Sequence, residues 1–265
     1  MQASDNMRGV ISVKEGSTMR RRDFIAVMAA ILALPRVAGA EQHMCEAASD
    51  PECPGDIPLV YDDIRFDGNA VSNALRLSPG GAASKKSITQ TGSVASIVTS
   101  DGATIRNCRI SSRECVRIGG SGSFLIDNCY LEALGVEPDH ADVIQAYSPG
   151  SRGTLKVSNT GIVTHGVAAN VGLFIADNWT GTIDLENVAF VGGGVNFGLR
   201  IHPDAGGDNI IKLRNVFFIP PFRYAPYLFG NVGHRKNIIE LWENVRMATI
   251  ENGKLALGPA LPKPF

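Results

Sequence analysis

Residues 183–190 read IDLENVAF, a short apolar strand pattern that Asn187 interrupts. The pattern occurs six times, as ATIRNCRI at Asn107, FLIDNCYL at Asn128, LKVSNTGI at Asn159, IDLENVAF at Asn187, IKLRNVFF at Asn215 and LWENVRM at Asn244. The steps between these asparagines are 21, 31, 28, 28 and 29 residues. A repeat of this length, rich in Val, Ile, Leu and Phe, indicates strands stacked in a solenoid. The sequence therefore predicts an all-β, single-domain parallel β-helix of about seven coils.

Apolar residues flank each asparagine at fixed positions. Ile105, Ile126, Val157, Leu185 and Leu213 stand two residues before it, and Ile110, Leu131, Ile162, Phe190, Phe218 and Met247 stand three after it. Both columns are expected to face one interior. Asparagine tolerates the left-handed conformation of a turn, and on coils about 4.8 Å apart its amide can donate to the next asparagine. We expect an asparagine ladder, the alternative being independent turn residues. In the last repeat Glu240 and Trp242 replace apolar residues, which predicts a bulge or a cap.

This repeat resembles the right-handed parallel β-helix proteins of the pectate-lyase-like superfamily, over about Ile97 to Met247. The resemblance implies a right-handed solenoid. It implies little about the reaction, because one fold carries many chemistries.

Residues 1–40 have the features of a leader. Arg20–Arg22 precede an apolar run that continues to Leu34, and Ala38–Ala40 supplies a small-residue cleavage site. The motif Arg-Arg-x-Phe-Ile resembles a twin-arginine signal, which predicts cleavage after Ala40 and a periplasmic or secreted bacterial protein. A membrane anchor is the alternative, but the run is shorter than the roughly 20 residues that span a bilayer. We expect no stable membrane insertion after cleavage.

Charge and cysteines narrow the classes further. Without the 6 basic and 3 acidic residues of the leader, the 25 basic and 26 acidic residues of the chain become 19 and 23, a net charge of −4, so no nucleic-acid partner is expected. Cys45 and Cys53 are spaced for a disulfide in an oxidising compartment. Cys108 and Cys129 each follow a ladder asparagine, so a small buried pair is expected, with a bridge possible, and Cys115 is left over.

The remaining chain divides into three parts. Residues 41–96 are expected to form an N-terminal cap and one irregular first coil, with residues 78–87, SPGGAASKKS, as a loop. Residues 97–247 are the coils. Residues 248–265 are a closing tail, whose prolines exclude a central strand.

Within each of the four long coils, a second strand lies upstream of the asparagine, in DVIQAYS, VGLFIAD, FGLRIHP and PYLFGNV. We place Ile144, Leu173, Leu199 and Leu228 in one inward column. The residues one and three positions later then point outward: Gln145 and Tyr147, Phe174 and Ala176, Arg200 and His202, Phe229 and Asn231. Aromatic rings, amides and an arginine fork suit an acidic polysaccharide, whereas the alternative is an ordinary exposed sheet face.

The segment 137–147, EPDHADVIQAY, supplies a further candidate. His140 and Asp142 combine a near-neutral proton acceptor with a carboxylate that orients it or holds a cation. HADVIQ resembles the H-x-D-x-[IL]-Q strand of uncharacterised β-helix proteins of the same superfamily, and this match identifies no reaction. The alternative is that both residues satisfy turn amides.

Three classes of function remain open. A lyase would use Arg200 to neutralise a uronate, His202 or His140 as base, and Tyr147 as acid, with Gln145, Phe174, Phe229 and Asn231 binding the sugar. A hydrolase needs paired carboxylates, and Asp142, Asp177 and Asp204 share no column, so elimination is preferred. A non-catalytic glycan-binding protein and a structural or adhesion spacer are the alternatives. No cofactor is evident; calcium is possible, but neighbouring coils show no clustered carboxylates. Oligomeric state is open.

Overall fold

The structure is a computed structural model that describes residues 43–44, 53, 56–64, 70–71, 73–92, 94–135, 140–147, 151–165, 169–204, 206–231 and 233–265. These residues belong to one compact unit, Ala40–Phe265. The predicted leader and its cleavage site lie outside the described residues. The described part is all-β except for the short 3-10 helix η1 (Tyr61–Asp63).

Two sheets contain the strands. The larger, 13-stranded sheet follows the order β1 (His43–Met44), β20 (Lys254–Ala260), β19 (Asn237–Glu251), β17 (Asn209–Ile219), β15 (Thr180–Val191), β13 (Arg152–Thr164), β11 (Tyr130–Ala133), β8 (Arg109–Ser112), β5 (Ser87–Gln90) and β2 (Ala70–Val71), with β10 (Gly122–Asp127), β7 (Ala103–Arg106) and β4 (Gly81–Ser84) also paired into it. The 7-stranded sheet follows the order β18 (Phe222–Phe229), β16 (Val195–Ile201), β14 (Ala169–Ile175), β12 (Ala141–Ala146), β9 (Val116–Gly119), β6 (Ile97–Ser100) and β3 (Leu75–Arg76).

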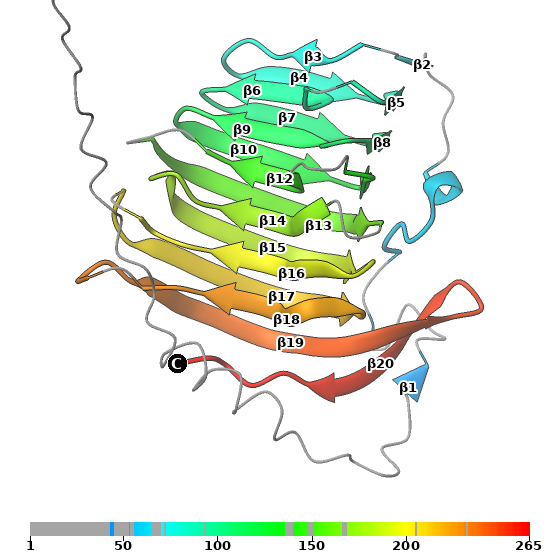
Figure 1. Ribbon diagram of the computed structural model, residues 1–265, viewed down its shortest axis with the longest axis vertical. Coiled ribbons are helices and arrows are strands. Elements are labelled where there is room, and N and C mark those ends of the chain that lie inside the picture. Colours follow the sequence, from blue (N-terminus) through cyan, green and yellow to red (C-terminus); the bar gives the residue numbers. More distant parts are fainter. Residues whose placement is uncertain are drawn as a thin grey trace, which may run out of the picture. The chain divides into compact units, whose positions relative to one another are not determined.

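Successive coils pair in parallel through both sheets, and Figure 1 shows the strands stacked in sequence order from β3 to β19. The chain is therefore a parallel β-solenoid, as the repeat predicted. Its regular part has about four turns, which carry the long strands β13, β15, β17 and β19.

The core lies between the two sheets and consists of the predicted columns. Ile126 pairs with Ile105 and Val157, and Val157 continues through Leu185 to Leu213. The column after the asparagines is also confirmed, because Phe190 pairs with Phe218, and their rings stack with centroids 5.1 Å apart. Alternation places every second side chain of a strand on the same face, so these columns form one continuous apolar interior.

The asparagine ladder is confirmed by backbone and side chains together. Each of the six asparagines is left-handed, with φ between 49 and 54°. Asn187 Nδ2 donates to Asn159 Oδ1 at 3.1 Å, and Asn215 donates to Asn187 at 2.9 Å. The ladder is interrupted once, after the longest step of 31 residues, where Asn159 donates to Asp127 Oδ1 at 3.0 Å instead of to Asn128.

The loop predicted for residues 78–87 is wrong for residues 81–84 and 87, which lie in strands. Strands β4 and β5 pair in parallel with β7 and β8 in the register of the repeat, so this segment belongs to the stack. Lys85 occupies the ladder position and is left-handed, with φ 52°. The sequence concealed this coil because lysine stands where the other coils have asparagine and alanine stands in the apolar column.

The segment 56–64 lies along the outer side of the larger sheet. Ile57 and Leu59 pack with Phe217 and Leu257, whereas Ile64 packs with Tyr130, which lies nearer the first coils. Asp62 adds an ion pair with Arg109 at 3.1 Å. Residues 56–64 therefore cover a flank of the solenoid, and the N-terminal cap stays a prediction.

The cysteines fall into the two predicted groups. Cys53 is disulfide-bonded, while its predicted partner Cys45 lies outside the described residues. Cys108, Cys115 and Cys129 are buried free thiols, as expected for a small apolar pair and a leftover residue.

The C-terminal end is closed by a hairpin and the tail. The register shifts between Ile211 and Lys212 so that Glu240 is left over, which confirms the bulge. Strand β20 pairs antiparallel with β19 on one side and with the two-residue strand β1 on the other. The prediction that prolines keep the tail out of a central strand is therefore wrong, because Pro259 lies beyond the residues of β20 that pair with β1. Beyond it, Leu261 O accepts from Trp242 Nε1 at 2.9 Å, and Pro262 O accepts from Tyr227 Oη at 2.9 Å.

Candidate functional site

One outward column crosses the 7-stranded sheet. Gln145 pairs with Arg117 on the coil before and with Phe174 on the coil after, and Phe174 pairs with Arg200. The structure thus brings Gln145, Phe174 and Arg200 together as predicted. It adds Arg117, which sequence reasoning missed although the residue lies in a recognisable short strand.

The predicted position of Phe229 is wrong by one residue. Leu228 pairs with Arg200, whereas Phe229 pairs with the inward Ile201. Tyr227, not Leu228, stacks on Leu199, after a register shift between Val195 and Phe197. Phe229 packs against Tyr227 and Trp242, with ring centroids 5.3 and 6.2 Å apart. It therefore packs against the end of the core and is not part of the outward column.

Arg200 lies over the aromatic ring beneath it. Its guanidinium carbon is 4.8 Å from the centroid of Phe174, a favourable cation–π distance. Its Nε is buried and has no hydrogen-bond partner among the described residues. A buried donor without an acceptor is costly, which sets Arg200 apart from the other described side chains.

His202 is oriented by a neighbouring carboxylate. Its Nδ1 shares a 2.5 Å hydrogen bond with Asp204 Oδ1, and Asp204 Oδ2 accepts from the backbone N–H of Asp177 at 2.6 Å. Engagement of Nδ1 leaves Nε2 as the ring nitrogen available to a ligand. Asp204, considered above only as a carboxylate for hydrolysis, here serves to hold the imidazole. The signal for this role is its spacing of two residues from His202.

Tyr147 is separated from His202 by two coils, whereas Asn231 is one residue out of the predicted column. Tyr147 is 42% exposed, and the guanidinium carbon of Arg117 is 5.5 Å from its ring centroid. Coil register places Tyr147 two coils, roughly 10 Å, from His202. Gly230, not Asn231, follows His202 in the column, and Asn231 Oδ1 accepts from Asn237 N at 3.0 Å. Asn231 therefore has a turn role that the sequence pattern did not predict.

His140 and Asp142 do not form the predicted pair on one surface. His140 is exposed immediately before β12, whereas Asp142 is only 1% exposed. Asn170 donates to Asp142 at 3.1 Å, and Asn196 donates to Asn170 at 2.7 Å, so Asp142 ends a second polar ladder. Burial raises the pKa of Asp142 well above its usual range, and the nearby Glu114 carboxylate adds to the effect.

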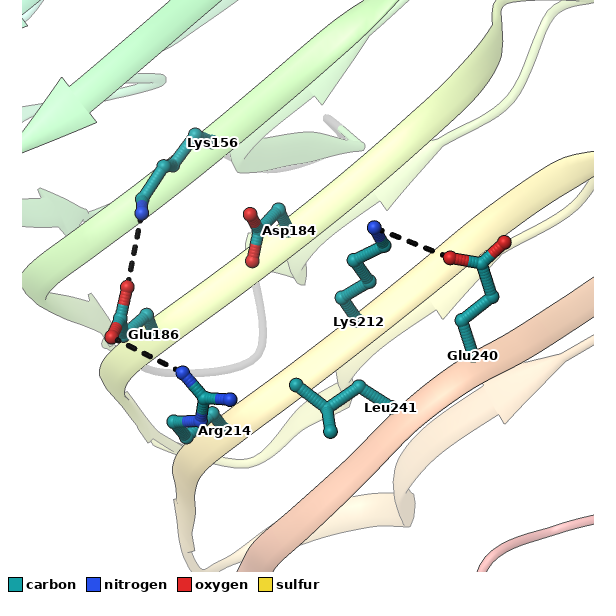
Figure 2. A pocket seen from close by; sticks show the side chains of 7 residues that line it. All are labelled: Lys156, Asp184, Glu186, Lys212, Arg214, Glu240 and Leu241. Atoms are coloured by element: carbon teal, nitrogen blue, oxygen red, sulfur yellow. Dashed lines mark hydrogen bonds and ion pairs between the residues drawn. The ribbon is translucent and has the colours of Figure 1, made fainter.

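The larger sheet carries a charged outer face that sequence reasoning also missed. A hollow of about 360 Å³ is lined by Lys156, Asp184, Glu186, Lys212, Arg214, Glu240 and Leu241. Figure 2 shows Glu186 between Lys156 and Arg214, with nitrogen–oxygen distances of 3.0 and 3.8 Å, and Lys212 paired with Glu240 at 3.2 Å. The sequence does contain a sign of this charged face. The residue just before the asparagine alternates in charge on three successive coils, as Glu186, Arg214 and Glu243. These mutual pairs leave little charge for a ligand.

A further cluster of polar side chains, formed by Tyr130, Glu132 and His165, lies on and beside β11, where Tyr130 packs against Ile64. Glu132 Oε1 accepts from Tyr130 Oη at 3.1 Å and lies 2.6 Å from His165 Nε2. Tyr130 is 4% exposed, and burial raises its pKa. The buried tyrosine and the shared carboxylate oxygen indicate a structural network.

No group of three or more metal-ligating side chains occurs within the part of the chain that the structure describes. In the same part, no helix has the length and apolarity needed to span a bilayer. Comparison with known proteins finds no family model, no curated protein and no solved structure that matches this chain.

Proposed function

We propose that this β-solenoid acts on an acidic, uronate-containing polysaccharide at the outward surface of β12, β14 and β16, and that it cleaves the polymer by β-elimination. One observation carries the proposal: Arg200 stacks on Phe174 with a buried Nε that lacks an acceptor among the described residues. An aromatic ring under a planar cationic fork suits a sugar ring with a carboxylate.

His202 would act as the base in this reaction. It lies two residues from Arg200 on the same face, and Asp204 holds its Nδ1. When Arg200 pairs with the uronate carboxylate, the negative charge that develops as the α-proton leaves is stabilised. His202 Nε2 would accept that proton, and the leaving oxygen would be protonated by a second group or by water.

Non-catalytic glycan binding is the second candidate. It is favoured by the position of Tyr147, whose ring contacts Arg117 two coils away from His202, so the predicted acid is not beside the predicted base. His140 is exposed directly before β12, at the other end of that strand from Tyr147, and would contact only a longer ligand.

Finer features of the fold and of export belong to the same proposal. We propose a right-handed solenoid of the pectate-lyase-like superfamily with about seven coils, an N-terminal cap, and a twin-arginine leader removed after Ala40. The repeat and the Arg20–Arg22 motif support these assignments. The protein would be periplasmic or secreted.

Incubation of the full chain with polygalacturonate, alginate and a neutral glucan tests the function. A lyase produces an unsaturated uronate, so ultraviolet absorbance should rise with at least one acidic polymer and stay flat with the neutral one. Binding without a rise in absorbance would favour the second candidate. Neither binding nor turnover on any uronate polymer would overturn both.

A further inference from the structure

The proposed elimination does not use Arg117, although this arginine shares the outward column. Arg117, Gln145, Phe174 and Arg200 are paired in that order on β9, β12, β14 and β16. Coils are about 4.8 Å apart, so the backbones of the two arginines are separated by roughly 14 Å.

The two side chains narrow this separation. Arg117 contacts Tyr147, which follows β12 on the next coil, whereas Arg200 lies over Phe174 on β14, the preceding coil. Each guanidinium therefore leans along the stack toward the other coil, Arg200 within the column and Arg117 diagonally, because Tyr147 lies two residues beyond Gln145. The two positive groups therefore contact rings on neighbouring coils, those of β12 and β14.

Arg117 is held rigidly by a buried carboxylate. Its Nε donates to Glu114 Oε1 at 2.8 Å and its Nη2 donates to Glu114 Oε2, while Arg113 Nη1 lies 3.2 Å from Glu114 Oε2. Glu114 is 1% exposed, so it does not itself meet a ligand. One carboxylate between two arginines leaves a net positive charge at the surface. Fixing a guanidinium in advance lowers the entropic cost of binding.

We propose that Arg117 and Arg200 bind the anionic groups of two successive sugar units. This inference rests on the proposed function, because both arginines belong to the same outward surface. The coil spacing matches about one sugar unit of an extended chain, so two guanidinium groups on neighbouring coils suit a polymer with a carboxylate on every unit. A polymer that alternates acidic and neutral sugars engages one arginine at a time.

Calorimetric titration of the full chain with tetragalacturonate and with a hyaluronan tetrasaccharide tests the preference. Each ligand has the same length, but only the first carries a carboxylate on every sugar. We expect the first to bind at least tenfold more tightly, with a steeper dependence on salt.

Two variants assign this preference to the arginines. Glu114→Gln/Arg117→Gln removes a cation without leaving a buried carboxylate unpaired, and Arg200→Gln removes the other. Each should weaken tetragalacturonate binding at least tenfold, whereas Arg214→Gln on the charged outer face should leave it unchanged. If the double variant fails to fold, Arg117→Lys keeps the charge beside Glu114 but loses the planar fork, and it should still weaken binding.

The outcomes separate the two levels of the proposal. Equal affinity for the two tetrasaccharides, or a loss confined to Arg200→Gln, overturns the two-arginine inference and leaves the proposed function standing. Binding of neither tetrasaccharide by the unaltered chain also overturns the two-arginine inference, and the proposed function itself falls only if no uronate polymer, alginate included, is bound or cleaved.

Discussion

Asn187 combines two requirements that few residues meet together. Its backbone is left-handed, with φ 54°, and its side chain both donates to Asn159 and accepts from Asn215. A β-branched or long side chain would strain the turn, while glycine would leave both amide neighbours unpaired. The same backbone conformation and amide hydrogen bonds recur at the ladder position, which explains why asparagine recurs with the period of the coils.

Asn187→Ala should lower the free energy of unfolding by about 1–3 kcal/mol, because Asn215 loses its acceptor and Asn159 loses its donor. Urea unfolding followed by circular dichroism measures the change. Asn73→Ala is the matched control, since Asn73 is exposed outside the ladder. Asn209 is unsuitable because it is fully buried and donates to Asn237 at 3.1 Å. Equal stability of the two variants would contradict a stabilising ladder.

Asp142 should make the protein less stable as pH rises. Its folded-state pKa lies above the unfolded value of about 3.9, so its stabilising contribution is complete only below about pH 4 and is lost as pH rises through the folded-state pKa. Asp142→Asn keeps an acceptor for Asn170 and removes the charge. At pH 8 we expect Asp142→Asn to have a Tm at least about 2 °C above that of the unaltered chain. For a chain of this size, that shift corresponds to about 1 kcal/mol in the free energy of unfolding.

Melting curves of both proteins from pH 3.5 to 8 check this expectation. The two curves should converge toward the acid end, where the native carboxyl is protonated. A lower Tm for Asp142→Asn at pH 8 would show that the carboxylate is needed in its charged form, for example by Arg200.

The residues that the sequence predicted well are those that repeat. The ladder and its flanking columns recur six times, so one physical explanation accounts for all of them. Asp142 was misplaced because a single His-x-Asp segment does not reveal which side chain a strand entrance buries. Arg200 and His202 were placed on one face because alternation within a strand needs no knowledge of the loops.

Strand register was less predictable than strand identity. In PYLFGNV both Tyr227 and Leu228 can fill an inward column, and the sequence does not show that Tyr227 is the one that packs against Phe218 and Trp242. This register moves Phe229 out of the predicted outward column and packs it against the core. The path of residues 56–64 was also not predictable, because an irregular segment carries no period.

Gly161 should control how that segment docks. A Cβ on Gly161 would lie 1.9 Å from Pro58 O, a distance that forces the segment away from β13. Gly161→Ala should therefore loosen the contacts of Ile57 and Leu59 and lower stability by about 1–3 kcal/mol.

Limited proteolysis with mass spectrometry measures this effect. Cleavage between residues 53 and 64 should accelerate in Gly161→Ala and stay slow in Gly92→Ala, where the added Cβ meets nothing closer than 3.6 Å. Equal cleavage rates would mean that the segment is not held against Gly161.

Across the solenoid, the two described outer surfaces differ in how their charges are used. On the larger sheet Lys156, Glu186 and Arg214 neutralise one another, and exposed pairs of this kind contribute little stability each. On the 7-stranded sheet Arg200 rests on an aromatic ring with an unpaired donor. Because of this contrast, we propose that the 7-stranded sheet is the ligand surface.

Turnover of Arg200→Ala on a uronate polymer tests that assignment most directly. We predict a loss of at least tenfold relative to the unaltered chain, or about 1.4 kcal/mol of transition-state stabilisation, with Tm nearly unchanged. Arg214→Ala, on the other sheet, should retain full turnover. Undiminished turnover and glycan affinity in Arg200→Ala would contradict the central claim, because the arginine would then be part of a solvated face.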